Sequence, residues 1–322
     1  MSDLGTITER IDRITSLEPA YRHIVLPAPK SVKIELTGRC NLKCSFCARS
    51  MELREQQDMD RNLFERLLAE MRIDGVEEIG LFYLGESLLV KWLPEAINYA
   101  KNTIGFPYVF LTTNGTLATG KRCEALFRAG LDSLKFSFNY ADEQQFEDIA
   151  GMPKKLFSSM VGNVKAAQFV RDKVERETGH RCKLYASYIE YDGEQGEKMQ
   201  DAIDSVAPYL DEVYALPLYS QAEHVGASER AKGWNVTAGN RGRAGALREP
   251  LPCWSVFSEG HISWDGKLSA CCFDHDGRFE MGDLTQQSFM SAWNSQKFQE
   301  LRSAHLNKDV CCTVCEKCAV GG

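Results

Sequence analysis

The spacing of apolar residues changes repeatedly between residues 31 and 216. Short apolar runs rich in β-formers alternate with longer stretches in which apolar positions recur three or four residues apart. The runs predict strands at 32–36, 78–83, 108–112, 133–138, 184–189 and 212–216. The longer stretches predict helices near 61–73, 93–103, 119–129, 155–173 and 194–208. This alternation favours parallel strand pairing through right-handed crossovers, hence an α/β fold with a partial (β/α)6 barrel spanning residues 31–220.

The segments on either side of the barrel have other patterns of apolar and polar residues. Residues 1–30 carry apolar positions at helical spacing, which predicts a short amphipathic helix packed against the barrel. Residues 221–252 hold five glycines with scattered charges and no sustained period, so we expect a loop-rich bridge. Residues 253–322 form a small Cys-rich segment, in which Asp265-Gly266 joins two short runs as a hairpin and 288–302 has helical spacing.

Composition narrows the class of protein. The chain has 322 residues, 43% of them hydrophobic, and a formal net charge of −7. That charge argues against a dedicated partner of nucleic acid or of anionic membranes, because both would repel the average surface. The sequence has no apolar run approaching the roughly 18 residues of a spanning helix, and its first residues lack a signal-peptide pattern. We therefore expect a cytoplasmic protein that binds neither nucleic acid nor membrane.

The twelve cysteines fall into two groups, at 40–47 and at 253–318, with only Cys123 and Cys182 outside them. In a reducing compartment such clusters are more often metal sites than disulfides. Cys123 and Cys182 are interpreted as ordinary buried thiols.

The first group directly follows the first predicted strand. Cys40, Cys44 and Cys47 stand four and three residues apart, and the loop falls at the strand's carboxyl end, where α/β folds place their sites. Three thiolates can hold three irons of a cubane cluster and leave the fourth iron without a protein ligand. Such an iron can chelate and reduce a small molecule. By spacing alone, a zinc knuckle or an ordinary cluster is also possible.

The C-x3-C-x2-C string, with Phe46 before its last cysteine, resembles the signature of the radical S-adenosylmethionine (SAM) superfamily. Leu84-Gly85-Glu86-Ser87, after the second predicted strand, is similar to that superfamily's glycine and glutamate motif, although Leu84 stands where a glycine is common. The resemblance implies a SAM-binding 4Fe–4S cluster on Cys40, Cys44 and Cys47. It also implies that Gly85 and Glu86 contact the methionine ammonium, for which a carboxylate is a suitable acceptor.

Further residues resemble cofactor-binding positions of the same superfamily. Asn114 follows the third strand, and Ser137 and Asn139 follow the fourth. The resemblance assigns these three residues, together with Phe46, to cofactor binding, and Ser137 and Asn139 suit ribose hydroxyls. As residues alone, they are equally well explained as turn caps.

The second cysteine group resembles the twitch or SPASM extension of the superfamily, which holds auxiliary iron–sulfur clusters. The matching pattern is Cys253, Gly266-x4-Cys271 and a terminal C-x2-C, which we expect to supply one auxiliary 4Fe–4S cluster. The implied ligands are Cys253, Cys271, Cys315 and Cys318. Spacing leaves open whether Cys312 replaces Cys318, and whether the four thiolates hold structural zinc instead. Cys272 and Cys311 are packed thiols or, alternatively, hydrogen-atom donors to a product radical.

The resemblance implies an enzyme that reductively cleaves SAM to a 5′-deoxyadenosyl radical, which abstracts a hydrogen from substrate. Only about 30 residues precede the barrel, which favours dehydrogenation or epimerisation of a small polar substrate such as a sugar, aminocyclitol or nucleoside. Modification of a ribosomally made peptide and a non-catalytic iron–sulfur electron carrier remain alternatives. A flavodoxin- or ferredoxin-type electron donor is expected.

Polar residues after the last barrel strand are candidates for substrate contact, and Arg241 with Arg243 would suit a phosphate or carboxylate. The candidates are Tyr219, Gln221, His224, Asn240, Arg241 and Arg243.

Overall fold

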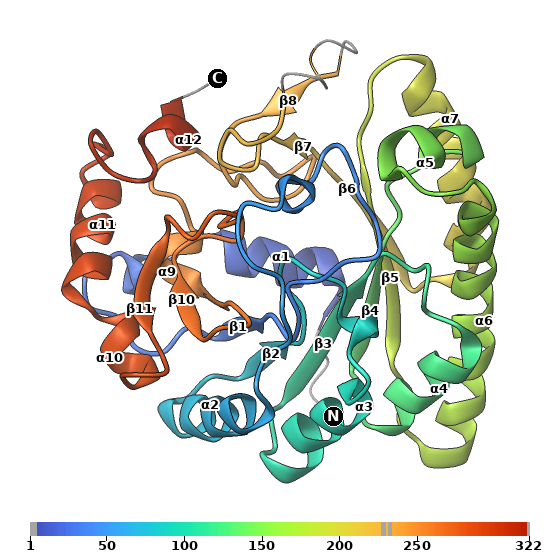
Figure 1. Cartoon of the computed structure of the whole chain (residues 1–322), viewed down its shortest axis with the longest axis horizontal. Coiled ribbons are helices and arrows are strands. Elements are labelled where there is room, and N and C mark those ends of the chain that lie inside the picture. The colour runs from blue at the N-terminus through green and yellow to red at the C-terminus, as the bar shows by residue number, and fades with distance from the viewer. Residues whose placement is uncertain (1–4, 227–229, 231–233, 321–322) are drawn as a thin grey trace.

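A computed structural model describes residues 5–226, 230 and 234–320, and predictions that fall on other residues lie outside it. Six parallel strands pair in chain order, as the alternating pattern predicted. They are β1 (Ser31–Ile34), β2 (Glu78–Gly80), β3 (Tyr108–Thr113), β4 (Ser133–Ser137), β5 (Lys183–Ile189) and β6 (Glu212–Leu216). The curved sheet is visible in Figure 1, with β1 to β6 running from blue to yellow. The predicted partial barrel is therefore confirmed, with strand ends that differ from the prediction by at most three residues.

The C-terminal segment continues the same sheet. Strand β9 (Glu259–Ile262) pairs in parallel with β1, in register from Ser31 opposite Glu259. It then forms the predicted hairpin with β10 (Lys267–Ser269), and β11 (Glu280–Asp283) adds a final antiparallel strand. The resulting nine-stranded order is β11-β10-β9-β1-β2-β3-β4-β5-β6. A further short pair, β7 (Leu218–Tyr219) with β8 (Val236–Thr237), lies in the bridge.

Helices of the crossovers cover the outer face of the sheet (Figure 1), and the remaining helices lie elsewhere. The described α-helices are α1 (Ile7–Thr15), α2 (Arg61–Asp74), α3 (Leu93–Asn98), α4 (Gly120–Arg128), α5 (Glu143–Ala150), α6 (Lys155–Thr178), α7 (Glu194–Val206), α9 (Ser255–Ser258), α10 (Phe289–Trp293), α11 (Gln296–Leu306) and α12 (Glu316–Val320). The predicted helix at 93–103 is α3 followed by a π-helical turn. The predicted single helix at 288–302 is wrong, because a break at Asn294 and Ser295 divides it into α10 and α11. Helix α5 was not predicted.

Capping residues explain where several helices begin and end. In α1, Thr6 and Glu9 form a reciprocal capping box. In α5, the Asp142 side chain accepts from the Gln145 amide, and Gly151 ends the helix at a φ of 62°. The α5 segment has only eight residues between these caps, so its helical period was too short to stand out in the sequence.

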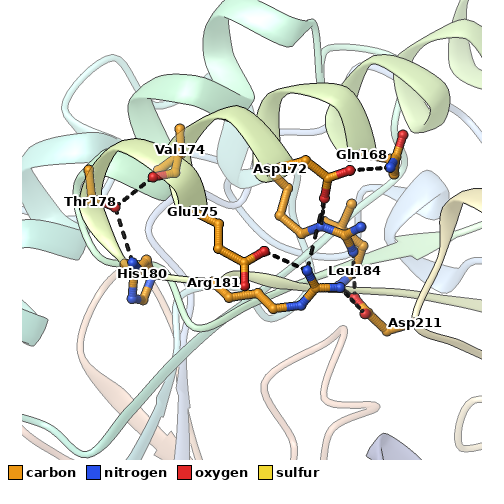
Figure 2. Close-up of polar contacts among 10 residues, drawn as sticks. Gln168, Asp172, Val174, Glu175, Thr178, His180, Arg181, Leu184 and Asp211 are labelled. Carbon is orange, nitrogen blue, oxygen red and sulfur yellow. Dashed lines mark hydrogen bonds and ion pairs between the residues drawn. The ribbon is translucent and has the colours of Figure 1, made fainter.

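A charged network fixes α6 against the sheet, as Figure 2 shows. The Asp211 carboxylate accepts hydrogen bonds from the Leu184 amide at 2.7 Å and from Arg171 and Arg181 at 2.8 Å each. Burial alone would raise the pKa of Asp211, but these hydrogen bonds and the two guanidinium charges outweigh it and lower the pKa. This pairing connects α6 to the start of β6.

Helix α1 lies across the interior of the sheet, where the amphipathic pattern placed it against the barrel (Figure 1). The Ile7 amide donates to Glu212 of β6 at 2.7 Å, and Arg10 forms a buried ion pair with Glu78 of β2. The helix therefore bridges β2 and β6, which are separated in the sheet by β3, β4 and β5. Cys123 and Cys182 are buried, as predicted.

Candidate metal centres and cofactor site

The loop that carries Cys40, Cys44 and Cys47 follows β1 at its carboxyl end. The Cys47 amide donates to the Cys44 carbonyl at 3.0 Å, which curls the chain so that the three thiols face one region. The Tyr140 hydroxyl lies 2.8 Å from the Cys44 Sγ, and the Asn114 amide group lies 3.9 Å from the Cys40 Sγ. Burial raises the pKa of all three thiols, that of Cys47 to about 11. A bound cation would reverse that effect, because metal ligation requires the thiolate.

Distant segments hold this loop in place. The Lys43 and Ser45 amides donate to the carbonyls at the end of α5, at 3.0 and 2.9 Å. On the other side, the Gln221 side chain accepts from the Ala48 amide at 2.9 Å and donates to the Phe46 carbonyl at 2.8 Å. Gln221 was predicted as a candidate for substrate contact. Its two hydrogen bonds instead make it a clamp on the backbone beside Cys47.

Gly85 and Glu86 pack directly against the same loop. A Cβ added at Gly85 would lie 2.0 Å from the Thr37 carbonyl oxygen and 2.7 Å from that of Arg39. The Glu86 amide donates to the Arg39 carbonyl at 2.8 Å. Glycine is therefore required here by the close approach of two backbones, and this contact positions the chain immediately before Cys40.

The Glu86 side chain is 2% exposed and already has three donors. Its oxygens accept from the Thr113 hydroxyl at 2.9 Å, the Leu88 amide at 3.1 Å and the Asn114 amide at 2.8 Å. Burial raises its pKa despite these bonds. A carboxylate offers about four acceptor positions, so one position remains, which suits a single ammonium donor.

The remaining residues assigned to the cofactor lie at the same edge of the sheet. Asn114 donates to the Asn41 side chain at 2.9 Å, and Phe46 is buried beside the Tyr140 ring. Ser137 ends β4, and Asn139 follows it with its carbonyl accepting from Tyr191 at 3.0 Å. The fold brings the predicted positions together at the carboxyl ends of neighbouring strands. It also adds Tyr140 and Gln221, which no local motif had indicated.

A cavity of about 230 Å³ lies inside the barrel. Its wall combines inward-facing strand residues, α1 and the bridge, with Lys33, Lys135, Tyr214 and Cys272 among the lining side chains. Cys272 and Cys311 were predicted to be either packed thiols or hydrogen-atom donors. Cys272 lines this cavity, and the Asn240 side-chain amide donates to its sulfur at 3.1 Å. Cys311 is exposed and lies 3.7 Å from the Cys312 sulfur.

Four C-terminal thiols meet in a smaller cavity. Cys253, Cys271, Cys315 and Cys318 all line it, together with His305 and Asn240. Burial raises the pKa of these thiols, that of Cys253 to about 12, and neighbouring thiolate charges add to the effect. For Cys271, the hydrogen bond with Cys272 is the largest cause. Cys312 is exposed, and its amide donates to Glu316 at 3.1 Å.

The spacing of the thiols bears on which metal fits. Tetrahedral zinc with bonds of about 2.3 Å requires sulfurs about 3.8 Å apart. In the part of the chain that the structure describes, Cys311, Cys312 and Glu316 are the one group of three or more possible ligands within 4.8 Å of one another. The barrel thiols and the four C-terminal thiols are more widely spread, which fits iron–sulfur clusters better than single zinc ions.

Two predicted substrate contacts are not supported. Arg243 pairs with both oxygens of Asp12 on α1, at 2.9 and 2.6 Å. Arg241 donates to the Arg248 carbonyl at 2.7 Å. The Arg243 guanidinium attaches the bridge to α1, and that of Arg241 links two parts of the bridge. Of the other candidates, Tyr219 and Asn240 line the cavity inside the barrel. His224 lies 3.2 Å from Asp276.

Comparison with known families agrees with this arrangement. Residues 34–211 match the radical SAM superfamily, and this range covers more than half of the chain. The chain belongs to the radical SAM superfamily. Residues 253–319 of this radical SAM protein also match the SPASM iron–sulfur cluster-binding domain. Its cofactors are therefore SAM and a 4Fe–4S cluster, with auxiliary iron–sulfur binding in the SPASM domain. Among the described helices, none is long and apolar enough to cross a membrane.

Curated relatives of this radical SAM protein act on different substrates. A GTP 3′,8-cyclase from Chlorobaculum tepidum is 36% identical over 118 residues, which is 37% of this chain and 35% of the relative. A PqqA peptide cyclase from Methylobacterium nodulans is 35% identical over 128 residues, 39% of this chain and 33% of the relative. The matches thus span about a third of the relatives' own length.

Solved structures share the fold of this radical SAM protein. BtrN in complex with AdoMet and 2-DOIA superposes with a TM-score of 0.54 at 17% identity, covering 86% of each chain. Streptococcus suis SuiB bound to the precursor peptide SuiA gives a TM-score of 0.64 at 14% identity, covering 88% of this chain and 68% of SuiB.

Proposed function

We propose that this enzyme abstracts a hydrogen atom from a small polar substrate held in the cavity inside the barrel, leading to dehydrogenation or epimerisation. The central observation is the position of that cavity. It is about 230 Å³ in volume, and it borders both the barrel strands and Cys272, the neighbour of Cys271. A substrate there would lie beside Cys272, next to the candidate auxiliary centre. The volume is below the usual 300–1,000 Å³ of ligand pockets, which favours a small molecule.

The cofactors would be held by the residues described above. Cys40, Cys44 and Cys47 would ligate the first cluster, while the free acceptor position of Glu86 would receive the SAM ammonium. Asn114, Ser137 and Asn139 lie at the same edge of the sheet and would contact the rest of SAM, with Phe46 packed beneath. When bound, this pair supplies a 5′-deoxyadenosyl radical that abstracts hydrogen. The task of the barrel is to exclude water and to hold one C–H bond near that radical.

Cys253, Cys271, Cys315 and Cys318 would ligate one auxiliary cluster, because all four thiols line one cavity and Cys312 does not. In a dehydrogenation, the substrate loses one hydrogen atom, one electron and one proton, and the auxiliary cluster is suited to accept the electron. In an epimerisation, a hydrogen atom is returned to the same carbon. Cys272 has the position for that donation, because its thiol lines the substrate cavity, and an electron from the auxiliary cluster with a proton from solvent would restore the thiol.

Anaerobic reconstitution with iron and sulfide, followed by dithionite and SAM, tests the activity. We expect 5′-deoxyadenosine even without substrate, and a higher rate when a metabolite fraction below about 1 kDa is added. A reduced, intact cluster that yields no 5′-deoxyadenosine would contradict the enzyme and would favour an electron carrier.

A peptide substrate is the second candidate. Two PqqA peptide cyclases are 34% and 35% identical over 125 and 128 residues, and SuiB, solved with a precursor peptide, has the higher TM-score of the two structures compared above. Stimulation by a peptide fraction, and not by the small-metabolite fraction, would favour this candidate over ours.

A further inference from the structure

Four of the charged side chains in and beside the wall of the cavity inside the barrel form two ion pairs. The Lys33 ammonium lies 2.7 Å from the Glu259 carboxylate, and Arg10 pairs with Glu78 while its guanidinium stacks 4.2 Å above the Phe110 ring. Each pair brings one positive and one negative charge. These four residues therefore add no net charge to the interior of the barrel.

Glu259 already has three hydrogen-bond donors, and the structure gives it no bond to Lys135. Besides Lys33, it accepts a hydrogen bond from His261 at 3.1 Å and lies 3.5 Å from the Ser31 hydroxyl. Burial alone would raise its pKa, but the charge of Lys33 and the bond from His261 lower it to about 2. Burial also lowers the pKa of His261. The carboxylate is thus ionised at neutral pH, and its hydrogen bonds go to Lys33, His261 and Ser31.

Lys135 remains as a surplus amine. It projects from β4 into the same cavity, and within the described residues it has neither an ion pair nor a hydrogen bond. Its ammonium lies 5.7 Å from the Tyr214 ring centre. Burial and the nearby charges of Lys33 and Arg10 lower its pKa to about 7, although the Glu259 carboxylate partly opposes this shift. A half-buried ammonium whose one described contact is an aromatic ring lacks a counter-charge, and an anion beside it would supply one.

The wall near Lys135 also offers a hydrogen-bond donor. Ser133, two residues earlier on β4, accepts the Tyr108 hydroxyl at 2.7 Å. Its own hydroxyl hydrogen is therefore available, and Ser133 lines the cavity. An ammonium and a hydroxyl from one strand are the groups that a carboxylate or phosphate needs.

We propose that Lys135 binds an anionic group of the substrate, a carboxylate or a phosphate, inside the barrel. This inference rests on the proposed function, since it takes the cavity as the substrate site. It narrows the substrate class from any small polar molecule to a small anion. The net charge of −7 would repel an anion from the average surface of the protein, so attraction of the substrate would depend on the positive charge of Lys135 inside the cavity.

Protection from chemical labelling tests the proposal on the cluster-loaded protein with SAM at pH 7. The uncharged reagent N-hydroxysuccinimidyl acetate acetylates free amines, and mass spectrometry of peptides gives the rate at each lysine. We expect 50 mM inorganic phosphate or 50 mM acetate to slow labelling of Lys135 by at least about tenfold. The rates at Lys121, an exposed residue on α4, should change by less than about twofold. Protection by one anion alone identifies the substrate's group.

Three outcomes would overturn the proposal: no labelling of Lys135 at all, labelling that neither anion slows, or equal protection by glycerol at the same concentration. Labelling without protection would indicate a proton-accepting amine instead. Lys135→Met and Lys135→Arg provide a second readout, because phosphate should raise the melting temperature of the wild type and the Arg variant but not of the Met variant. Uncoupled 5′-deoxyadenosine formation is measured separately on the wild type, and its absence there would reject the proposed function whatever phosphate does to the melting temperature.

Discussion

Replacing Gly85 by alanine tests whether the approach of two backbones positions the first metal centre. The added Cβ would lie 2.0 Å from the Thr37 carbonyl oxygen, whereas real Cβ contacts are essentially never under 3.0 Å. The two loops must therefore separate by at least about 1 Å. That displacement moves the segment before Cys40 and breaks the alignment of the Glu86 amide with the Arg39 carbonyl.

A displacement of about 1 Å at a reacting centre can reduce a rate by about 100-fold. We therefore expect Gly85→Ala to lower dithionite-driven formation of 5′-deoxyadenosine from SAM by about that factor, measured by chromatography under anaerobic conditions. The C-terminal thiols do not contact Gly85, so the auxiliary iron should be retained. Circular dichroism should show unchanged secondary structure.

Gly162→Ala is the matched control. Gly162 is exposed in the middle of α6, and a Cβ there would meet no atom within 4 Å. Alanine is favoured over glycine in a helix by about 0.5–1 kcal/mol, so this variant should keep its activity and be slightly more stable. A Gly85→Ala enzyme that works within about threefold of the wild type would refute the reasoning.

Three further predictions follow from the geometry. Cys318→Ser should lose about half of the iron in a colorimetric assay while Cys312→Ser keeps it, and the reverse pattern would show that Cys312 is the ligand. Glu86→Gln should weaken SAM binding about 10- to 100-fold in isothermal titration, because it removes a charge-assisted hydrogen bond of about 1.5–3 kcal/mol; unchanged affinity would separate Glu86 from the cofactor. Asp211→Asn should lower the free energy of unfolding by about 2 kcal/mol in urea under argon, whereas the exposed Asp201→Asn should not. Because folding lowers the pKa of Asp211 below its ordinary 3.8, its stabilisation is full above pH 4 and is lost as the pH falls through the folded-state value, so the two free energies should converge there.

Local sequence was sufficient for the class of fold and for locating the loop at the centre of the candidate site. A change of apolar period is a property of consecutive residues, so the six strands were located, and β6 was placed correctly at both ends. The three cysteines at 40–47 lie within one loop, and their mutual spacing is already set by the chain. The capped but short α5 and the break between α10 and α11 were missed, because five to eleven residues carry too little periodicity to separate one helix from the next.

Tertiary structure alone decided which residues meet across the barrel. Gln221 clamps the loop beside Cys47 although 174 positions separate them, and Tyr140 reaches the Cys44 sulfur from another crossover. Cys318 and Cys312 have equivalent spacing to Cys315, and only the course of the chain after α11 brings Cys318 to the other thiols. Likewise, Lys33 and Lys135 are alike in sequence, but the pairing of β9 with β1 gives Lys33 a carboxylate and leaves Lys135 without one. The physical reason is that strand pairing, and not sequence spacing, fixes which charges share a buried space.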